Sequence, residues 1–350
     1  MLNAAERAAT VDSIASLQLS NGMIPWFDGG HADPWNHVEA AMALSIGGRR
    51  QEAEAAYAWL AATQHDDGSW CSYYLAGNVV EDPRRDTNVS LYIATGVWQH
   101  YLCSGDREFL ASMFPFVERA VQFALRLQRR DGALLWSLEL DGTPGGFALL
   151  TGSSSAAFSL RCAIAIVEEL GQERPEWELA AGRLAHAVAR QPESFEPKDR
   201  WAMDWYYPVL CGALAGDAGR ARLAERWDAF VIDGRGVRCV SDRPWVTAAE
   251  TAECALAHDV VGDTQRAREL LSSTRSLRDT DGSYWTGVVL PQEVNYPGGE
   301  RSSYTAAAVV LADAALSDSS PASALFRGTS LPTYVTADIG VDTARATRGL

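Results

Sequence analysis

The stretch LQLSNGMIPW (17–26) ends an apolar helical segment in a glutamine and continues into a loop that contains a glycine and a tryptophan. The same order of residues returns as TQHDDGSW (63–70), LQRRDGALLW (127–136) and, without the glutamine, LRDTDGSYW (277–285). Each Asn-Gly or Asp-Gly pair is a turn signal, because glycine accepts the positive φ that a tight turn requires. The copies therefore predict a repeated unit of helix, turn and long loop.

Two kinds of helix alternate between these loops. One kind is rich in charge, with apolar residues at i, i+3, i+4 and i+7, which is typical of a helix with one buried face. The other kind is apolar nearly all round, as in NVSLYIATGVW (88–98), so we expect it to be buried on every side. The charged helices are predicted at 4–19, 51–63, 106–128, 177–190, 218–230 and 264–276, and the apolar helices start near 33, 86, 153, 204, 247 and 302.

Six amphipathic helices alternating with six buried ones, at a period of roughly fifty residues, predict an all-α fold, an (α/α)6 toroid of six helical hairpins. An open α-solenoid is the alternative, but its repeats should be shorter and more uniform. The long loops favour the closed ring, and the pattern needs no strands. We expect one toroid domain over 1–317 and a Ser-, Thr- and Gly-rich tail over 318–350 that is partly irregular or disordered.

Composition excludes several classes of function. The net charge of −15 repels phosphate, so we expect no nucleic-acid partner. No apolar run approaches the ~18–20 residues of a membrane span, and charges interrupt residues 1–18 where a signal peptide would be apolar, which favours a cytoplasmic protein. The six cysteines form no CxxC pair and are expected to be reduced. HExxH, P-loop, GxGxxG and GxSxG motifs are missing, so we expect neither a metal nor a cofactor.

Aromatic residues gather at one predicted end of the ring, because every long loop leads into the N-terminus of an inner helix. Eight of the twelve tryptophans fall there, where they either fill the core or line a cavity. Rings of Trp and Tyr stack on sugars, enclose isoprenoids or stabilise carbocations. The expected ligand-binding residues are Trp26, His37, Glu39, Trp70, Tyr74, Arg85, Asn88, Trp136, Ser154, Trp205, Tyr206, Tyr207, Trp245, Trp285, Tyr296 and Tyr304.

Acidic residues gather at the same end. Asp86 and Asp204 are well placed to be helix N-caps or first-turn acids. Glu39 and Glu250 differ, because each stands inside an apolar inner helix, where a carboxylate needs a cationic partner or a function. Two carboxylates across a cavity are what glycosidic cleavage requires, one to protonate the leaving oxygen and one to activate water. The candidate catalytic residues are Glu139, Glu250, Glu293, Glu300, Asp86 and Asp204.

The segment DTNVSLYIATGVWQHYLCSGDREFLASMFPFVERAVQFALRLQRRDGALLW (86–136) resembles the six-hairpin glycosidases, which share its Gly-Asp turn, its Pro-containing helix and its Gln–Gly–Trp loop. The ending ERSSYTAAAVVLA (300–312) is similar to their last inner helix. This resemblance implies an inverting, glycoside hydrolase-like enzyme of carbohydrate metabolism with a saccharide substrate. In glucoamylase-like members the acid follows the fifth helix and the base precedes the twelfth. Those places here hold Glu139, and Glu293 or Glu300.

A second resemblance links QHDDGSW (64–70) to the repeat of squalene cyclases and protein prenyltransferase β-subunits, another α/α toroid. It implies a terpenoid cyclase or prenyltransferase-like enzyme acting on an isoprenoid. The cyclase motif DxDD is missing, however, and the nearest segment is EDPRRDT (81–87). A non-catalytic toroid that binds glycan or lipid is the third interpretation. The glycosidase is the leading hypothesis, and the other two stay open.

Overall fold

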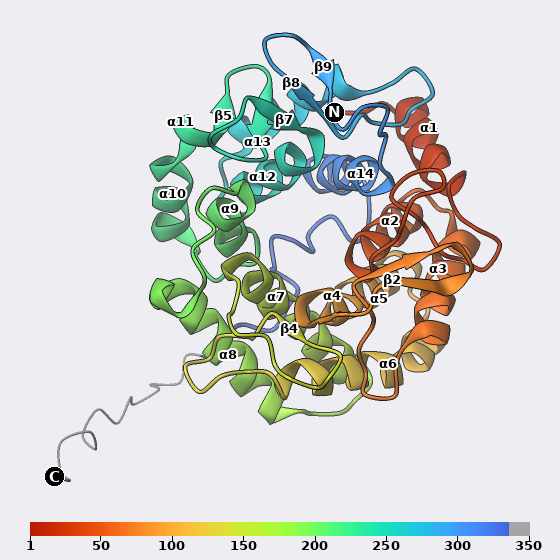
Figure 1. Cartoon of the computed structure of the whole chain (residues 1–350), viewed down its shortest axis with the longest axis vertical. Helices are drawn as coiled ribbons and strands as arrows, with labels where there is room; N and C mark the ends of the chain where they lie inside the picture. The colour runs from red at the N-terminus through yellow and green to blue at the C-terminus, as the bar shows by residue number, and fades with distance from the viewer. Residues whose placement is uncertain (336–350) are drawn as a thin grey trace, which may run out of the picture.

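The predicted toroid is confirmed by a computed structural model, which describes residues 1–335 and forms a ring of helices around a central axis (Figure 1). The inner helices of the described chain are α2 (Pro34–Ile46), α4 (Thr87–Leu91) with α5 (Ile93–Ser104), α7 (Leu150–Glu169), α9 (Ala202–Leu210), α12 (Ala248–Val260) and α14 (Ser303–Ser317). The outer helices are α1 (Ala4–Ala15), α3 (Arg50–Thr63), α6 (Arg107–Leu125), α8 (Pro175–Arg190), α10 (Gly216–Glu225) with α11 (Trp227–Phe230), and α13 (Thr264–Ser273). Each inner helix contacts the next around the circle, and α14 packs on α2 to close it.

The repeated glutamine joins one hairpin to the next. The side-chain amide of Gln64 donates to the carbonyl of Gly68 in its own turn (3.0 Å) and to the carbonyl of Phe116 in the next outer helix, α6 (2.9 Å). The carbonyl of Gly68 needs this donor, because no backbone N–H of the described chain reaches it in the turn. One side chain therefore fixes the turn and docks it on its neighbour.

The other copies repeat this bridge. Gln18 donates to the carbonyl of Glu52 in α3, and Gln128 donates to the carbonyl of Ala180 in α8. In the copy that lacks glutamine, Arg278 takes the same place and reaches the carbonyl of Glu6 in α1 (3.2 Å). The last turn is thus docked on the first helix. The ring closes through the same kind of contact that joins its hairpins, a side-chain hydrogen bond from the turn to a carbonyl of the next outer helix.

Glycine is required in each of these turns. Gly68 has φ +93°, and a Cβ there would overlap the carbonyl of Arg119, one turn beyond the bridge to α6. Gly282 stands in the same relation to Ala9 of α1. The turn backbone thus lies directly on the neighbouring helix, which a larger residue would prevent.

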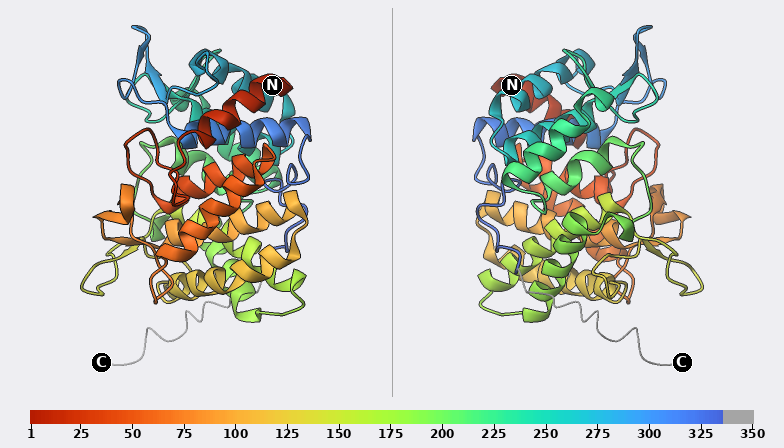
Figure 2. Two further views of the ribbon diagram at one scale, coloured as in Figure 1. Left: turned by 90° about the vertical axis from the view of Figure 1, so that its right-hand side faces the viewer. Right: turned by 90° about the vertical axis from the view of Figure 1, so that its left-hand side faces the viewer.

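Short strands occupy the long loops, contrary to the expectation that the fold needs none. A loop exposes backbone N–H and C=O groups, and pairing into hairpins satisfies them. The described strands are β1 (Tyr73–Leu75) with β2 (Val79–Asp82), β3 (Arg85–Asp86) with β4 (Ser137–Leu138), and an antiparallel sheet of β5 (Val231–Ile232), β6 (Gly236–Arg238), β7 (Trp245–Thr247), β8 (Gly287–Val289) and β9 (Val294–Asn295). Figure 2 shows these hairpins projecting from one end of the ring, as predicted for the loops.

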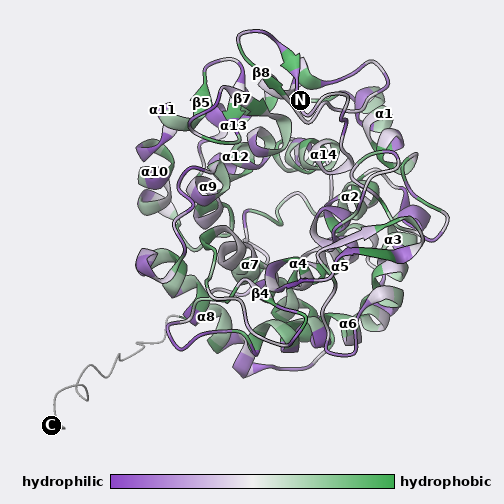
Figure 3. Cartoon of the chain, viewed as in Figure 1, coloured by the Kyte–Doolittle hydropathy of each residue, from purple (hydrophilic) through white to green (hydrophobic). Residues whose placement is uncertain are grey.

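Helix α7 corrects a second expectation, that no apolar run approaches the length of a membrane span. It has 20 residues and is long and apolar enough to cross a membrane, yet 83% of its most apolar stretch is buried inside the protein. An inner helix of a ring is enclosed on all sides, which accounts for this composition. Figure 3 shows that hydrophilic residues gather instead on the outward side of the outer helices.

The segment that follows α14 closes the end of the ring opposite the hairpins (Figures 1 and 2). It consists of turns, in which Phe326 stacks on Phe158 of α7 with ring centroids 5.6 Å apart. The buried guanidinium of Arg161 in α7 donates to the carbonyls of Gly328 and Pro332. Of the predicted tail, residues 336–350 lie outside the described residues. All six cysteines are described and free, as expected.

We expect Gly68→Ala to lower the free energy of unfolding by about 4 kcal/mol, because it adds overlap with the Arg119 carbonyl to the strain of a positive φ. Gly142→Ala is the matched control, since Gly142 has φ +82° with open space around it, and we expect a loss of about 1 kcal/mol there. Urea denaturation of both variants measures the difference. Equal losses would show that the docking contact contributes nothing.

Candidate active site

A cavity of about 350 Å³ opens where the hairpins meet the N-termini of the inner helices. All six hairpins contribute to its wall, which combines flat aromatic surfaces with carboxylates. Its aromatic residues are Trp26, Trp35, Tyr73, Trp136, Tyr207 and Tyr304, and its acids are Asp33, Glu39, Asp86, Glu250 and Glu253.

The aromatic wall is held rigidly. Trp26 donates its indole N–H to Asp33 (2.6 Å) and meets the ring of Tyr304 edge-on, with centroids 5.0 Å apart. The guanidinium of Arg84 lies over the Trp136 ring, 4.6 Å from its centroid. Fixed aromatic faces beside polar groups suit a sugar ring, whose faces are apolar and whose edges carry hydroxyls.

Asp33 is the N-cap of α2 and is saturated with donors. Its carboxylate accepts from the side chains of Trp26 and Asn36 and from the backbone N–H groups of Trp35 and Asn36, at 2.6–3.0 Å. Burial raises its pKa, and these four donors act in the opposite direction. A carboxylate with four donors is an acceptor that orients its neighbours, and it has little room for a proton.

Asp86 caps α4 and accepts the backbone N–H of Val89 (2.9 Å). Burial raises its pKa to about 6, while hydrogen bonds from Val89 and Trp136 act to lower it. An aspartate with this pKa retains its proton in a substantial fraction of molecules in mildly acidic solution. Asp86 is therefore suited to donate a proton.

Glu250 stands in the first turn of α12 and accepts a hydrogen bond from Thr247. It is half-buried, so water in the cavity reaches its carboxylate. Helix α12 contacts α9 and α14, whereas α4 contacts α2 and α7 on the far side of the ring. Glu250 and Asp86 therefore approach the cavity from opposite sides.

Glu39 and Glu253 form the floor. Glu253 accepts from the hydroxyls of Tyr206 and Tyr207, the second at 2.7 Å, and burial raises its pKa to about 7. Glu39 accepts from Tyr92 (3.3 Å), and burial together with the nearby charge of Glu253 raises its pKa well above the ordinary value. Neither forms an ion pair with an Arg, Lys or His residue of the described chain.

Four of the candidate acids lie outside the cavity lining. Glu293 is exposed between β8 and β9 and pairs with Arg235 (2.7 Å). Glu300 accepts from a threonine in its own loop, and Glu139 accepts from a serine of β4. Asp204 is buried and accepts from a threonine of α7. Counting helices identifies the loops of Glu139, Glu293 and Glu300, but it does not predict how far each hairpin carries the side chain outward.

The structure brings the other two candidate acids, Asp86 and Glu250, into the cavity. The expected binding residues divide three ways. Six line the cavity, namely Trp26, Glu39, Asn88, Trp136, Tyr207 and Tyr304. Others are buried in the packing or support the floor, namely His37, Trp70, Tyr74, Ser154, Trp205 and Tyr206. The rest belong to the outer loops, namely Arg85, Trp245, Trp285 and Tyr296.

The residues predicted for the site leave out several that line the cavity, among them Glu253, Tyr73 and Arg84. Glu253 follows Glu250 by three positions, a spacing that places both carboxylates on one face of a helix and could have identified it. Tyr73 begins β1 and Arg84 follows the end of β2, where its carbonyl accepts from the N–H of Ser72 (2.7 Å), and the sequence gives no sign of that pairing. Within residues 1–335, no group of three His, Cys, Asp or Glu residues is arranged to hold a metal ion.

Comparison with known proteins identifies relatives of this site and fold. No model of a protein family matches the chain. The chain is 49% identical over 326 residues to the MMP endo-(1,4)-3-O-methyl-alpha-D-mannosidase of Mycolicibacterium hassiacum, covering 92% of this chain and 89% of that protein. The alignment thus extends over most of the length of both proteins.

Solved structures share the fold at low sequence identity. A glycosidase in complex with glucose superimposes with a TM-score of 0.68 at 15% identity, over 90% of this chain and 100% of that one. The mannosylglycerate hydrolase of Thermus thermophilus, in complex with Tris and D-glycerate, superimposes with a TM-score of 0.67 at 12% identity, over 87% of this chain and 99% of that one. The resemblance to the six-hairpin glycosidases is confirmed. The chain belongs to the family of the Mycolicibacterium hassiacum mannosidase and is a carbohydrate-active glycosidase.

Proposed function

We propose that this glycosidase hydrolyses internal α-1,4 bonds of a polysaccharide of 3-O-methylmannose with inversion, using Asp86 as general acid and Glu250 as general base. One observation carries the assignment of roles: these two carboxyl groups line the same cavity from opposite sides of the ring. Inversion needs this arrangement, because water attacks the face of the sugar opposite the leaving group.

The path of each proton is consistent with these two roles. The Asp86 proton passes to the glycosidic oxygen as the bond from that oxygen to the anomeric carbon breaks. Glu250 takes a proton from a water molecule whose oxygen forms the new bond to the same carbon. The burial that raises the pKa of Asp86 favours its protonated form, and the partial exposure of Glu250 admits the water.

The remaining polar residues suit recognition of the substrate. Asn36, Asn88 and Arg84 offer donors to sugar hydroxyls along the wall. Asp33 holds Asn36 and Trp26 in place through its hydrogen bonds. A methylated sugar has more apolar surface than an unmethylated one, and Trp26, Trp136 and their neighbours supply matching surface.

The substrate class follows from the 49% identical relative, whose name gives endo cleavage of a 3-O-methyl-mannose polymer. The cavity opens among the hairpins at one end of the ring, where all six hairpins line it. This opening is compatible with cleavage inside a chain, in which sugars extend beyond both sides of the broken bond.

We expect Asp86→Asn and Glu250→Gln each to lower kcat about a thousandfold, since each removes one proton-transfer group and leaves the shape of the site. Reducing-sugar assays with a 4-linked 3-O-methylmannose oligosaccharide measure this loss. Glu293→Gln, exposed and outside the cavity lining, is the control and should stay within about twofold of wild type. If Asp86→Asn were fully active and Asp33→Asn inactive, Asp86 would not be the general acid, and Asp33 would be assigned that role.

We expect the anomer released first to be opposite in configuration to the bond that is cut, because the two carboxyl groups act from opposite faces. Proton NMR during the first minutes of hydrolysis distinguishes the anomers, and mass spectrometry of the same sample identifies the fragments. Internal cleavage predicts several oligosaccharide lengths from the start. Release of single terminal sugars, or retention of configuration, would contradict the proposal.

The raised pKa of Asp86 also predicts a stability change. The folded protein holds this proton up to a pH of about 6, whereas the unfolded chain releases it near the ordinary value, so ionising Asp86 destabilises the fold as pH rises from about 4 to about 6. Asp86→Asn removes this penalty and should stabilise the protein by about 2 kcal/mol at pH 7, with much less effect at pH 4. Thermal unfolding at both pH values measures it. Exposed Asp66→Asn is the control, and an equal gain there would refute the explanation.

A further inference from the structure

A second, smaller chamber lies directly beneath the floor of the active-site cavity. Its volume is about 20 Å³, and it shares Glu39, Tyr207 and Glu253 with the cavity above. Each of the six helical hairpins contributes to its lining, and Phe326 of the C-terminal segment lies at its far side. It therefore sits at the centre of the ring, at the deepest point that a ligand entering from the hairpin end can reach.

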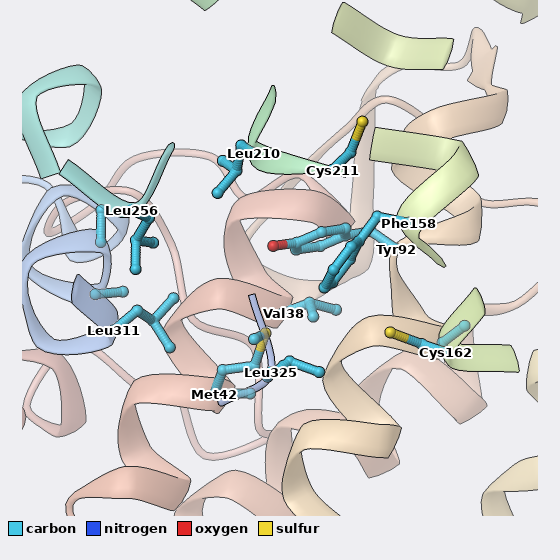
Figure 4. Packing of buried hydrophobic residues seen from close by; sticks show 14 of the residues in the cluster. Val38, Met42, Tyr92, Phe158, Cys162, Leu210, Cys211, Leu256, Leu311 and Leu325 are labelled. Carbon is cyan, nitrogen blue, oxygen red and sulfur yellow. The ribbon is translucent and has the colours of Figure 1, made fainter. Parts of the chain in front are cut away.

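Most of the lining of this chamber is apolar, with Ser155 as a polar residue away from the acids and tyrosines. Phe158, Leu210, Leu256 and Leu311 project into it from four inner helices, and Figure 4 shows these side chains converging on one space together with Tyr92. All of them are buried. A chamber of this composition offers few partners to a water molecule, which needs two to four hydrogen bonds to be held.

The size restricts what the chamber can take. A volume of about 20 Å³ admits one group of the size of a water molecule, and no sugar ring fits. A methyl group has the right size and gains free energy by leaving water for apolar surroundings. Because the chamber shares Glu39, Tyr207 and Glu253 with the cavity above, such a methyl group would belong to a ligand bound in that cavity.

Glu39 and Glu253 lie where the ether oxygen that carries the methyl group would be, and one of them can donate a hydrogen bond to it. A methylated oxygen has no hydrogen and only accepts, so it needs a donor. Both oxygens of Glu253 already accept from tyrosines, whereas the second oxygen of Glu39 has no hydrogen-bond partner in the described chain. Two neighbouring acids that lack an ion-pair partner repel each other when both are charged, so the pair is most stable with one proton bound. Burial and the charge of Glu253 raise the pKa of Glu39 well above the ordinary value, which makes Glu39 the acid that holds this proton. In its protonated form, Glu39 presents an O–H group to the opening.

We propose that the chamber binds the O-methyl group of a 3-O-methyl sugar at the closed end of the cavity, with the carboxylic acid of Glu39 donating to the ether oxygen. This inference rests on the proposed function and adds to it the structural basis for selecting methylated sugars. Glu39 is a binding residue in this proposal and takes no part in proton transfer to the glycosidic oxygen.

Filling the chamber tests the proposal. Ala308 lines the chamber from α14, and Ala308→Val should lower the ratio of kcat/KM for methylated over unmethylated 4-linked mannose oligosaccharides about tenfold. Ser155→Thr adds a single methyl group from α7 and should shift the ratio in the same direction, which keeps the test available if Ala308→Val does not fold. Ala306→Val, on the same helix but outside the chamber lining, should leave the ratio unchanged. A folded Ala308→Val protein with the wild-type ratio would overturn the proposal.

The role of Glu39 is tested by two replacements of similar size. Glu39→Gln keeps a donor, so kcat/KM on the methylated substrate should fall less than about tenfold, whereas Glu39→Leu should lower it at least a hundredfold, mainly through KM. Equal losses in both variants would overturn the role of Glu39. If wild-type protein cleaves both substrates equally well, the proposed hydrolysis stands and the chamber is not a methyl site. If it cleaves neither, the proposed function itself fails.

Discussion

The bridge from a turn glutamine to the carbonyl of the next outer helix is the contact on which the ring depends. A helical hairpin cannot bury both faces of its inner helix alone, so it must be held against a neighbour at a fixed distance and angle. Gln64 sets that geometry by binding its own turn and Phe116 together. Arg278 repeats the contact on α1, which makes the ring a closed series without an exposed end. Because closure is local and repeated, the long loops stay free to differ.

That freedom explains why the site lies where it does. The loops lead into inner helices, so their last residues are N-caps, and an N-cap prefers Asp and binds anions through free N–H groups. Asp33 and Asp86 are caps of this kind. Once the ring buries them, their desolvation is offset only in part, and Asp86 keeps a pKa of about 6. A residue that begins a helix, such as Asp86, can thus acquire the raised pKa that suits a proton donor, at some loss of stability.

The sequence predicts the ring well because its signals are local. A turn glycine, a glutamine and an apolar period recur at each hairpin, and Glu250 stood out as a carboxylate inside an apolar helix. The site is predicted only in part. Counting helices indicates Glu139 and Glu293, but the length and pairing of each hairpin decide whether a side chain points into the cavity. Tyr73 and Arg84 meet there only because β1 and β2 pair, a long-range fact that periodicity does not contain. His37 and Trp70 instead bind backbone carbonyls in the core.

Closure at the far end gives the cavity its depth. An open ring would be a channel, and a sugar polymer could pass through it. The C-terminal segment prevents this, held by Arg161, whose buried charge is satisfied by carbonyls of that segment. Such a cation is unfavourable without those acceptors, so the segment and α7 stabilise each other's positions. With one end sealed by Phe326 and the other lined by Trp26 and Trp136, substrate enters from a single side. In the mechanism proposed above, the depth of the closed end fixes which sugar stands between Asp86 and Glu250, so that selectivity at the floor becomes selectivity for the bond that is cut.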